Sequence, residues 1–220
     1  MPQDKGRAWP GPHFGPGTKQ EYSSFAYRVA GLLIERVTGM SFADAVRQRI
    51  TQPLQLTETS VPGTDPTLPA PVLIGYLTKT DGTVVDIADQ SGLASAMIST
   101  ASDIDRFFLA MMRGQLLAAE QQRELFAVPR DAAGTLLCDI DKAPAGTQCF
   151  GSGPMTTRLG DGTVLWGKTG HDVGYTGGVF STLDLQRHGV YAVGRITLDQ
   201  GDAPVLTARL ARAALEGMQH

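Results

Sequence analysis

Two short segments of the sequence carry residue types that can do chemistry. The first is Tyr22-Ser23-Ser24 and the second is Lys168-Thr169-Gly170. A phenol can accept and return a proton, a hydroxyl can hold a carboxylate, and an ammonium group supplies positive charge beside both. Each segment alone is weak evidence, because Lys-Thr-Gly also occurs in ordinary turns and a tyrosine near a helix start is usually a core residue. The elements around the two segments must therefore show whether they form a functional site.

The first segment stands at the boundary between a loop and a helix. Residues 1–20 are rich in proline and glycine, which is typical of a loop leading into a folded domain. A helical period then predicts a helix over residues 25–37, which Gly39 ends in the left-handed conformation. The residues expected on one apolar face of this helix are Tyr27, Ala30, Gly31, Ile34 and Val37.

Capping signals predict two more helices. Ser41 with Asp44 begins one that Pro53 ends, and Thr100 with Asp103 begins another that stops at Gly114. Weaker patterns predict a helix over residues 119–128 and an amphipathic helix over residues 203–218.

The second chemical segment falls where the pattern changes to strands. Short β-branched or aromatic runs at residues 163–166, 177–182 and 189–197 are separated by Gly and Asp turns. Residues 158–163 are typical of a hairpin connection. Helices followed by an antiparallel sheet and a terminal helix predict an α+β fold, with residues 1–220 in one domain.

Composition excludes several classes of function. The chain has 220 residues, of which 42% are hydrophobic and 19% charged, and its net charge of −3 includes 19 scattered Lys and Arg. We therefore expect no nucleic-acid partner. No apolar run approaches the ~20 residues that a membrane-spanning helix needs, and the first residues contain no apolar signal core. We expect neither a membrane span nor a signal peptide in this chain.

Cys138 and Cys149 flank a turn-rich stretch of ten residues. A bridge between them would stabilise the fold by about 3 kcal/mol and favour an oxidising compartment. Two unrelated thiols are an equally weighted alternative. The four histidines have no metal-ligand spacing, so no metal site is predicted. The sequence also has no Gly-x-Ser-x-Gly elbow and no phosphate-binding glycine loop.

The context of both segments resembles a known family. The motifs that carry the resemblance are Phe14-Gly15-Pro16-Gly17-Thr18, Tyr22-Ser23-Ser24, residues 31–39, residues 53–59, residues 92–117 and Gly167-Lys168-Thr169-Gly170 with the glycine-rich run after it. Their order and spacing are similar to those of the penicillin-recognising serine hydrolases, a group that includes class C β-lactamases, DD-peptidases and related esterases.

The resemblance implies both a fold and a site. The fold is β-lactamase/DD-peptidase-like, a helical region packed on an antiparallel sheet. Tyr22 is expected to relay a proton to the leaving group, Lys168 to supply positive charge beside it, and Thr169 to bind a substrate carboxylate. The other expected contacts to substrate are Ser24, Gly170 and the backbone amide of His171, which would be one donor of an oxyanion hole.

Two departures from the family pattern matter. The family's nucleophile is the serine of a Ser-x-x-Lys motif, and no Ser or Thr of these 220 residues has Lys at that spacing. We expect the sequence to be N-terminally truncated, with the nucleophile helix and the first sheet strands missing from it. In addition, Ser24 stands where the peptidase and lactamase members usually have Asn. A single hydroxyl offers fewer hydrogen bonds than an amide, which leaves room for an esterase.

The expected function is that of a serine acyl hydrolase of the β-lactamase or D-alanyl-D-alanine carboxypeptidase type, acting through an acyl-enzyme with no metal or organic cofactor. This chain alone is expected to be inactive. Its expected partners are a small-molecule or peptidoglycan-stem-like acyl substrate and the missing N-terminal segment. The resemblance implies an extracytoplasmic location, periplasmic or secreted. A non-catalytic binding or regulatory module on the same scaffold is the alternative.

Overall fold

The structure is a computed structural model that describes residues 13–63, 65, 68–87, 97–172, 174–197, 209 and 213. All structural statements below concern these residues. The helix expected over residues 203–218 lies almost wholly outside them, as does the start of the 92–117 motif region. No helix in the described ranges is long and apolar enough to cross a membrane.

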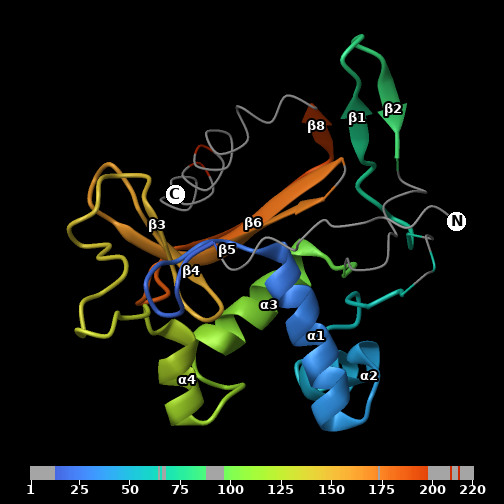
Figure 1. Ribbon diagram of the computed structural model, residues 1–220. Coiled ribbons are helices and arrows are strands. Elements are labelled where there is room, and N and C mark those ends of the chain that lie inside the picture. The colour runs from blue at the N-terminus through green and yellow to red at the C-terminus, as the bar shows by residue number, and fades with distance from the viewer. Residues whose placement is uncertain are drawn as a thin grey trace, which may run out of the picture.

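A five-stranded antiparallel sheet is the largest element of the fold (Figure 1). Its strands, in spatial order, are β3 (Gln148–Phe150), β4 (Met155–Arg158), β5 (Val164–Asp172), β6 (Tyr175–Ser181) and β7 (His188–Val193). The predicted hairpin joins β4 to β5, where the Leu159 N–H donates to the Thr163 carbonyl over 2.8 Å and Gly162 has a φ of 87°. Met155, Leu165 and Phe180 form the buried core of this sheet.

Two helices pack against one face of the sheet. The register makes Trp166, Ser181 and His188 neighbours on that face. The ring of Phe126 in α4 (Ala119–Phe126) meets Trp166 edge to face at 5.1 Å, and His188 Nδ1 lies 2.8 Å from an Asp105 carboxylate oxygen in α3 (Ala101–Met112). Figure 1 shows α3 running alongside the strands. Lys168, two residues after Trp166 in β5, projects toward the same side.

The remaining helices begin and end where the caps predict. α1 (Ser24–Thr38) stops at Gly39, which has a φ of 69°, and α2 (Phe42–Val46) begins where the Ser41 hydroxyl accepts from the Asp44 N–H. A single π-helical turn, η1 (Arg47–Thr51), continues α2 up to Pro53. Hydrogen bonds from Arg47 and then from Ser41 hold the pKa of the Asp44 carboxyl below its usual value.

The apolar face predicted for α1 is exposed except at Gly31, which is half-buried beside Phe42 of α2. Tyr27 is 53% exposed, Ile34 39% and Val37 76%, and Ala30 is exposed as well. The half-buried side of the helix faces α2 instead, where the Glu35 carboxylate accepts from the Phe42 N–H over 2.9 Å. Because α1 carries apolar residues on several sides, periodicity alone did not single out the side that contacts α2.

A second, three-stranded sheet has the order β2-β1-β8. It joins β1 (Tyr76–Thr78) and β2 (Val84–Asp86), which the sequence patterns did not predict, to β8 (Arg195–Thr197). The single strand predicted over residues 189–197 is divided between the two sheets at Gly194. A Cβ at that position would lie 2.2 Å from the Ile74 carbonyl oxygen, and the Gly194 carbonyl accepts from the Tyr76 N–H over 2.7 Å. This close approach turns the chain from β7 toward β1.

Candidate active site

Lys168, Thr169 and Gly170 lie in the part of β5 that extends beyond β4. The β4–β5 pairing ends at Met155 and Gly167, whereas the β5–β6 pairing continues to Asp172 and Tyr175. Within the described chain, β5 therefore has a strand on one side only from Lys168 onward. Such an edge leaves backbone N–H and C=O groups free to bind a ligand. The strand predicted at residues 163–166 thus continues through the Lys-Thr-Gly segment, as the family resemblance implied.

Tyr22 and Lys168 meet in space. The Lys168 ammonium nitrogen lies 4.8 Å from the centroid of the Tyr22 ring, within the range of a cation–π interaction. The same nitrogen donates to the Thr169 carbonyl over 2.8 Å. Tyr22 is 54% exposed, so its ring remains accessible from solvent. The expected proximity of these two residues, which come from opposite ends of the chain, is confirmed.

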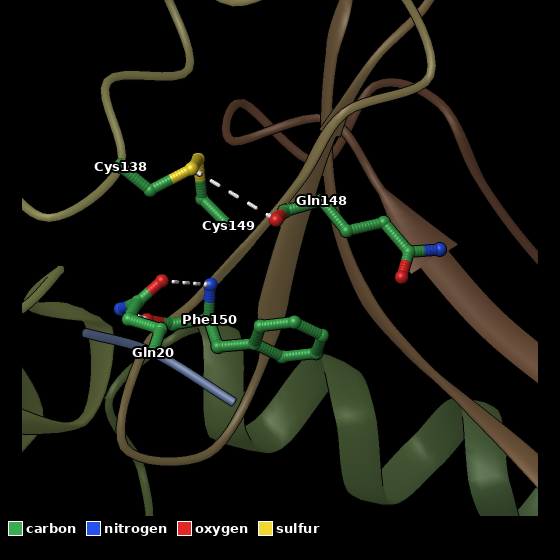
Figure 2. The surroundings of a disulfide bond; sticks show 5 residues. All are labelled: Gln20, Cys138, Gln148, Cys149 and Phe150. Atoms are coloured by element: carbon green, nitrogen blue, oxygen red, sulfur yellow. Dashed lines mark hydrogen bonds between the residues drawn. A yellow bond between two sulfur atoms is a disulfide. The ribbon is translucent and has the colours of Figure 1, made fainter. Parts of the chain in front are cut away.

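The segment that carries Tyr22 is attached to the outermost strand, β3. The Phe150 ring lies 6.1 Å from the Tyr22 ring, and the Gln20 side chain bonds to the Phe150 backbone (Figure 2). Cys149, the preceding residue of β3, is bridged to Cys138, so the disulfide that the sequence left open is formed. A bridged sulfur carries no proton, so the 3.8 Å approach of Cys138 Sγ to the Gln148 carbonyl is a contact rather than a hydrogen bond.

The other predicted site residues surround the open edge of β5. Thr169 is half-buried, and its side chain leaves the strand on the face opposite to Lys168 because neighbouring residues alternate. A ligand that contacts both must therefore lie along the edge. Gly170 and His171 are exposed, and the Gly170 carbonyl accepts from the Thr176 hydroxyl over 3.3 Å. Ser24 is the first residue of α1, and its side chain lies outside the described structure.

The glycines of this region differ in the space around them. A Cβ added at Gly170 would meet no atom within 4 Å, so the space beside it is open. A Cβ at Gly167 would lie 2.1 Å from the Val179 carbonyl oxygen, and one at Gly178 would lie 2.8 Å from the Tyr191 ring. Close packing therefore fixes β5 against β6 at Gly167 and β6 against β7 at Gly178, while the space beside Gly170 has room for a ligand.

A hollow of about 290 Å³ opens next to the Tyr22 segment. Its walls come from residues 18–20, from the Cys138 side of the disulfide and from Gln148 and Phe150 in β3. In the described ranges, no three His, Cys, Asp or Glu side chains lie close enough together to hold a metal ion.

Two residues of the site were not found from the sequence. Gln20 lies in a loop, and Phe150 ends a three-residue strand that no pattern predicted. Their contact joins residues 130 positions apart, and nothing in the local sequence of either signals it.

An antiparallel sheet packed against helices, with a tyrosine beside a Lys-Thr-Gly strand edge, is the arrangement that the resemblance to the penicillin-recognising serine hydrolases implied. Residues 4–214 match the family described as Beta-lactamase, and the chain belongs to that family.

Several solved structures are similar to this chain. A D-stereospecific amidohydrolase from Streptomyces sp. is 28% identical with a TM-score of 0.70, and the match covers 83% of this chain and 52% of that one. A penicillin binding protein from Bacillus halodurans is 23% identical with a TM-score of 0.69, covering 90% and 58%. An octameric penicillin-binding protein homologue from Pyrococcus abyssi is 19% identical with a TM-score of 0.70, covering 92% and 44%. The chain thus spans about half the length of each.

Proposed function

We propose that this chain supplies the proton-relay and Lys-Thr-Gly parts of the active site of a serine acyl hydrolase of the β-lactamase or D-alanyl-D-alanine carboxypeptidase type. The observation that carries the proposal is the Lys168 ammonium 4.8 Å from the Tyr22 ring, beside the open edge of β5. Two unrelated surface residues have no physical reason to meet at the stretch of this strand that has a partner on only one side among the described strands.

In the proposed reaction, a serine from polypeptide outside these 220 residues attacks the substrate carbonyl, and the bond to the leaving group breaks to give an acyl-enzyme. Tyr22 passes the proton of that serine to the leaving group. Lys168 stabilises negative charge that develops on the phenol oxygen during the transfer. Thr169 binds a substrate carboxylate, and the His171 amide donates to the carbonyl oxygen as its charge grows. Water then hydrolyses the acyl-enzyme.

The proposed substrate is an acyl compound with a D-amino acid unit, such as a peptidoglycan-stem-like peptide. The similarity to a D-stereospecific amidohydrolase supports this choice. An ester is the second candidate, because Ser24 offers one hydroxyl where the peptidase and lactamase members usually offer an amide. The Cys138–Cys149 bridge supports the proposed extracytoplasmic location, since disulfides persist in oxidising compartments.

The proposal is tested first on this chain alone and then on an extended protein. Incubated with a fluorescent penicillin, the 220-residue chain should show no added mass, because it lacks a Ser-x-x-Lys nucleophile. If the coding sequence upstream of Met1 encodes this motif in frame, the extended protein should form one acyl adduct at that serine. Stoichiometric labelling of any serine within the 220 residues would refute the assignment of roles.

The second part of the experiment tests the proposed roles of Tyr22, Lys168 and Thr169. In the extended protein, Tyr22→Phe and Lys168→Met should each lower the acylation rate by roughly 10²- to 10⁴-fold, the range expected for loss of positioned proton transfer. Thr169→Val should mainly raise the KM for substrates that carry a carboxylate. An upstream sequence without Ser-x-x-Lys would instead support the binding or regulatory alternative.

A further inference from the structure

At Phe150, the outer edge of β3 is covered by the side chain of Gln20. β3 is the first strand of the sheet, and its only strand partner in the described chain is β4. The backbone of Phe150 faces away from that partner. Its carbonyl accepts from Gln20 Nε2 over 2.5 Å, and its N–H donates to Gln20 Oε1 over 3.3 Å (Figure 2). The amide of Gln20 thus takes the place that the backbone of a neighbouring strand would otherwise fill.

Gln20 lies two residues before Tyr22, and both residues contact Phe150. Its backbone holds Gln20, while its ring lies 6.1 Å from the Tyr22 ring. Between Gln20 and Tyr22, the exposed Glu21 carboxylate pairs with His13 at 2.9 Å. No hydrogen bond joins the Tyr22 hydroxyl to another residue in the described parts of the chain. The position of the phenol therefore depends on the contacts of its segment.

The strand that receives Gln20 is itself fixed. Cys149 is fully buried and bridged to Cys138, and β3 is paired with β4 through Gln148, Cys149 and Phe150. β4 in turn pairs with β5, which carries Lys168. A continuous series of paired strands therefore connects β3, which holds Gln20, to β5, which carries Lys168.

We propose that Gln20 is a positioning residue, which holds Tyr22 beside Lys168 by pairing its side-chain amide with the backbone of Phe150. The catalytic consequence rests on the proposed function of Tyr22, but the positioning itself does not. The first readout is therefore the geometry of this chain, measured by NMR as contacts between the ring protons of Tyr22 and Phe150. The Tyr22 signals are assigned by their loss in Tyr22→Phe.

Three variants make the test specific. Gln20→Ala removes both hydrogen bonds and should abolish the Tyr22–Phe150 ring contact. Gln121→Ala, an exposed glutamine of α4, is the matched control and should retain it. Gln20→Glu should lose the contact at pH 7, because a carboxylate cannot donate to the Phe150 carbonyl. The same variant should regain it near pH 4, since a protonated carboxyl both donates and accepts, and a carbonyl partner favours the protonated form. The wild-type chain should retain the contact at both pH values.

Persistence of the ring contact in Gln20→Ala, or in Gln20→Glu at pH 7, would overturn the proposal. If Gln20→Ala loses its folded spectrum, the Gln20→Glu variant tests the proposal instead. Only a specific hydrogen bond to the Phe150 carbonyl predicts that the ring contact returns on acidification. In an active extended protein, Gln20→Ala should lower kcat about 10- to 100-fold with little change in KM. Loss of the ring contact without any effect on kcat would leave the positioning role intact and refute the proposed role of Tyr22.

Discussion

The main sheet and helix α1 bury their apolar side chains to very different degrees. In the sheet, Leu165 is fully buried, Met155 is 2% exposed and Phe180 3%. In α1, the residues of one stripe are open to solvent, namely Phe25 at 70%, Val29 at 47% and Leu32 at 65%. Their spacing of four and three residues places them along one side of the helix.

The difference separates the part of the fold that buries its apolar side chains among the described residues from the part that leaves them exposed. Strand pairing and side-chain packing inside the sheet depend on residues 148–193, all within one stretch of sequence. The stripe of α1 has no such partner in the described ranges, and an exposed apolar surface of this kind marks a place of association. The site spans both regions, because Lys168 lies in the sheet and Tyr22 lies at the start of α1.

The largest expected effect is a contrast between the same substitution in the two regions. Leu165→Ala should lower the free energy of unfolding by about 2–5 kcal/mol, since it leaves a cavity in a fully buried position. Leu32→Ala should change it by less than about 0.5 kcal/mol, because the side chain is already exposed. Urea denaturation of both variants measures the difference. Equal losses would show that α1 is packed against the rest of the chain in solution.

A second contrast lies within β5. Gly167→Ala should cost about 1–3 kcal/mol or more, because its Cβ would enter the space of the Val179 carbonyl. Gly170→Ala has open space and should change stability by less than about 0.5 kcal/mol. Thermal unfolding of both alanine variants tests the pair. A destabilised Gly170→Ala protein would mean that the site edge of β5 is covered.

Self-association of the isolated chain should depend on the exposed apolar stripe of α1. We expect the purified chain to self-associate at high concentration, through this stripe and through the edge of β7, which has no outer neighbour among the described strands. Val29→Lys with Leu32→Lys should reduce the associated fraction severalfold in light scattering and leave the unfolding midpoint unchanged. Adding the expected N-terminal segment should reduce association too. A monomeric wild-type chain at high concentration would contradict this prediction.

What the sequence could predict is mostly local. The caps at Ser41 and Thr100 and the turn at residues 158–163 were correct because each is made by residues within a few positions of one another. The exposed side of α1, the division at Gly194 and the Gln20–Phe150 contact depend on residues far apart in the chain. The meeting of Tyr22 with Lys168 was predictable only from the family resemblance, since no spacing rule links positions so distant.

The smallest expected effect concerns the β4–β5 turn. The Thr163 N–H and then its hydroxyl bond to the Asp161 carboxylate and hold its pKa below the usual value. A lowered pKa in the folded state stabilises the fold above the unfolded pKa near 3.9, and this contribution is lost as pH falls through the folded pKa. Asp161→Asn should therefore lower Tm slightly at pH 7 and by less at pH 2.5. The turn between β1 and β2 has the same Asp-Gly-Thr sequence, and the pKa of its Asp81 is lowered in the same way. Asp81→Asn is therefore the matched comparison and should show the same pH dependence of Tm. A Tm difference that grows on acidification would contradict this sign.

The central claim is that Tyr22 and Lys168 act together in one site. A double-mutant cycle on the acylation rate of the extended protein, with Tyr22→Phe, Lys168→Met and the pair, tests it most directly. Because Lys168 is proposed to act through the Tyr22 phenol, the double variant should be little slower than Tyr22→Phe alone. Rate losses that multiply, so that the double variant is slower by the product of the two single effects, would show that the two residues act independently and would contradict the account.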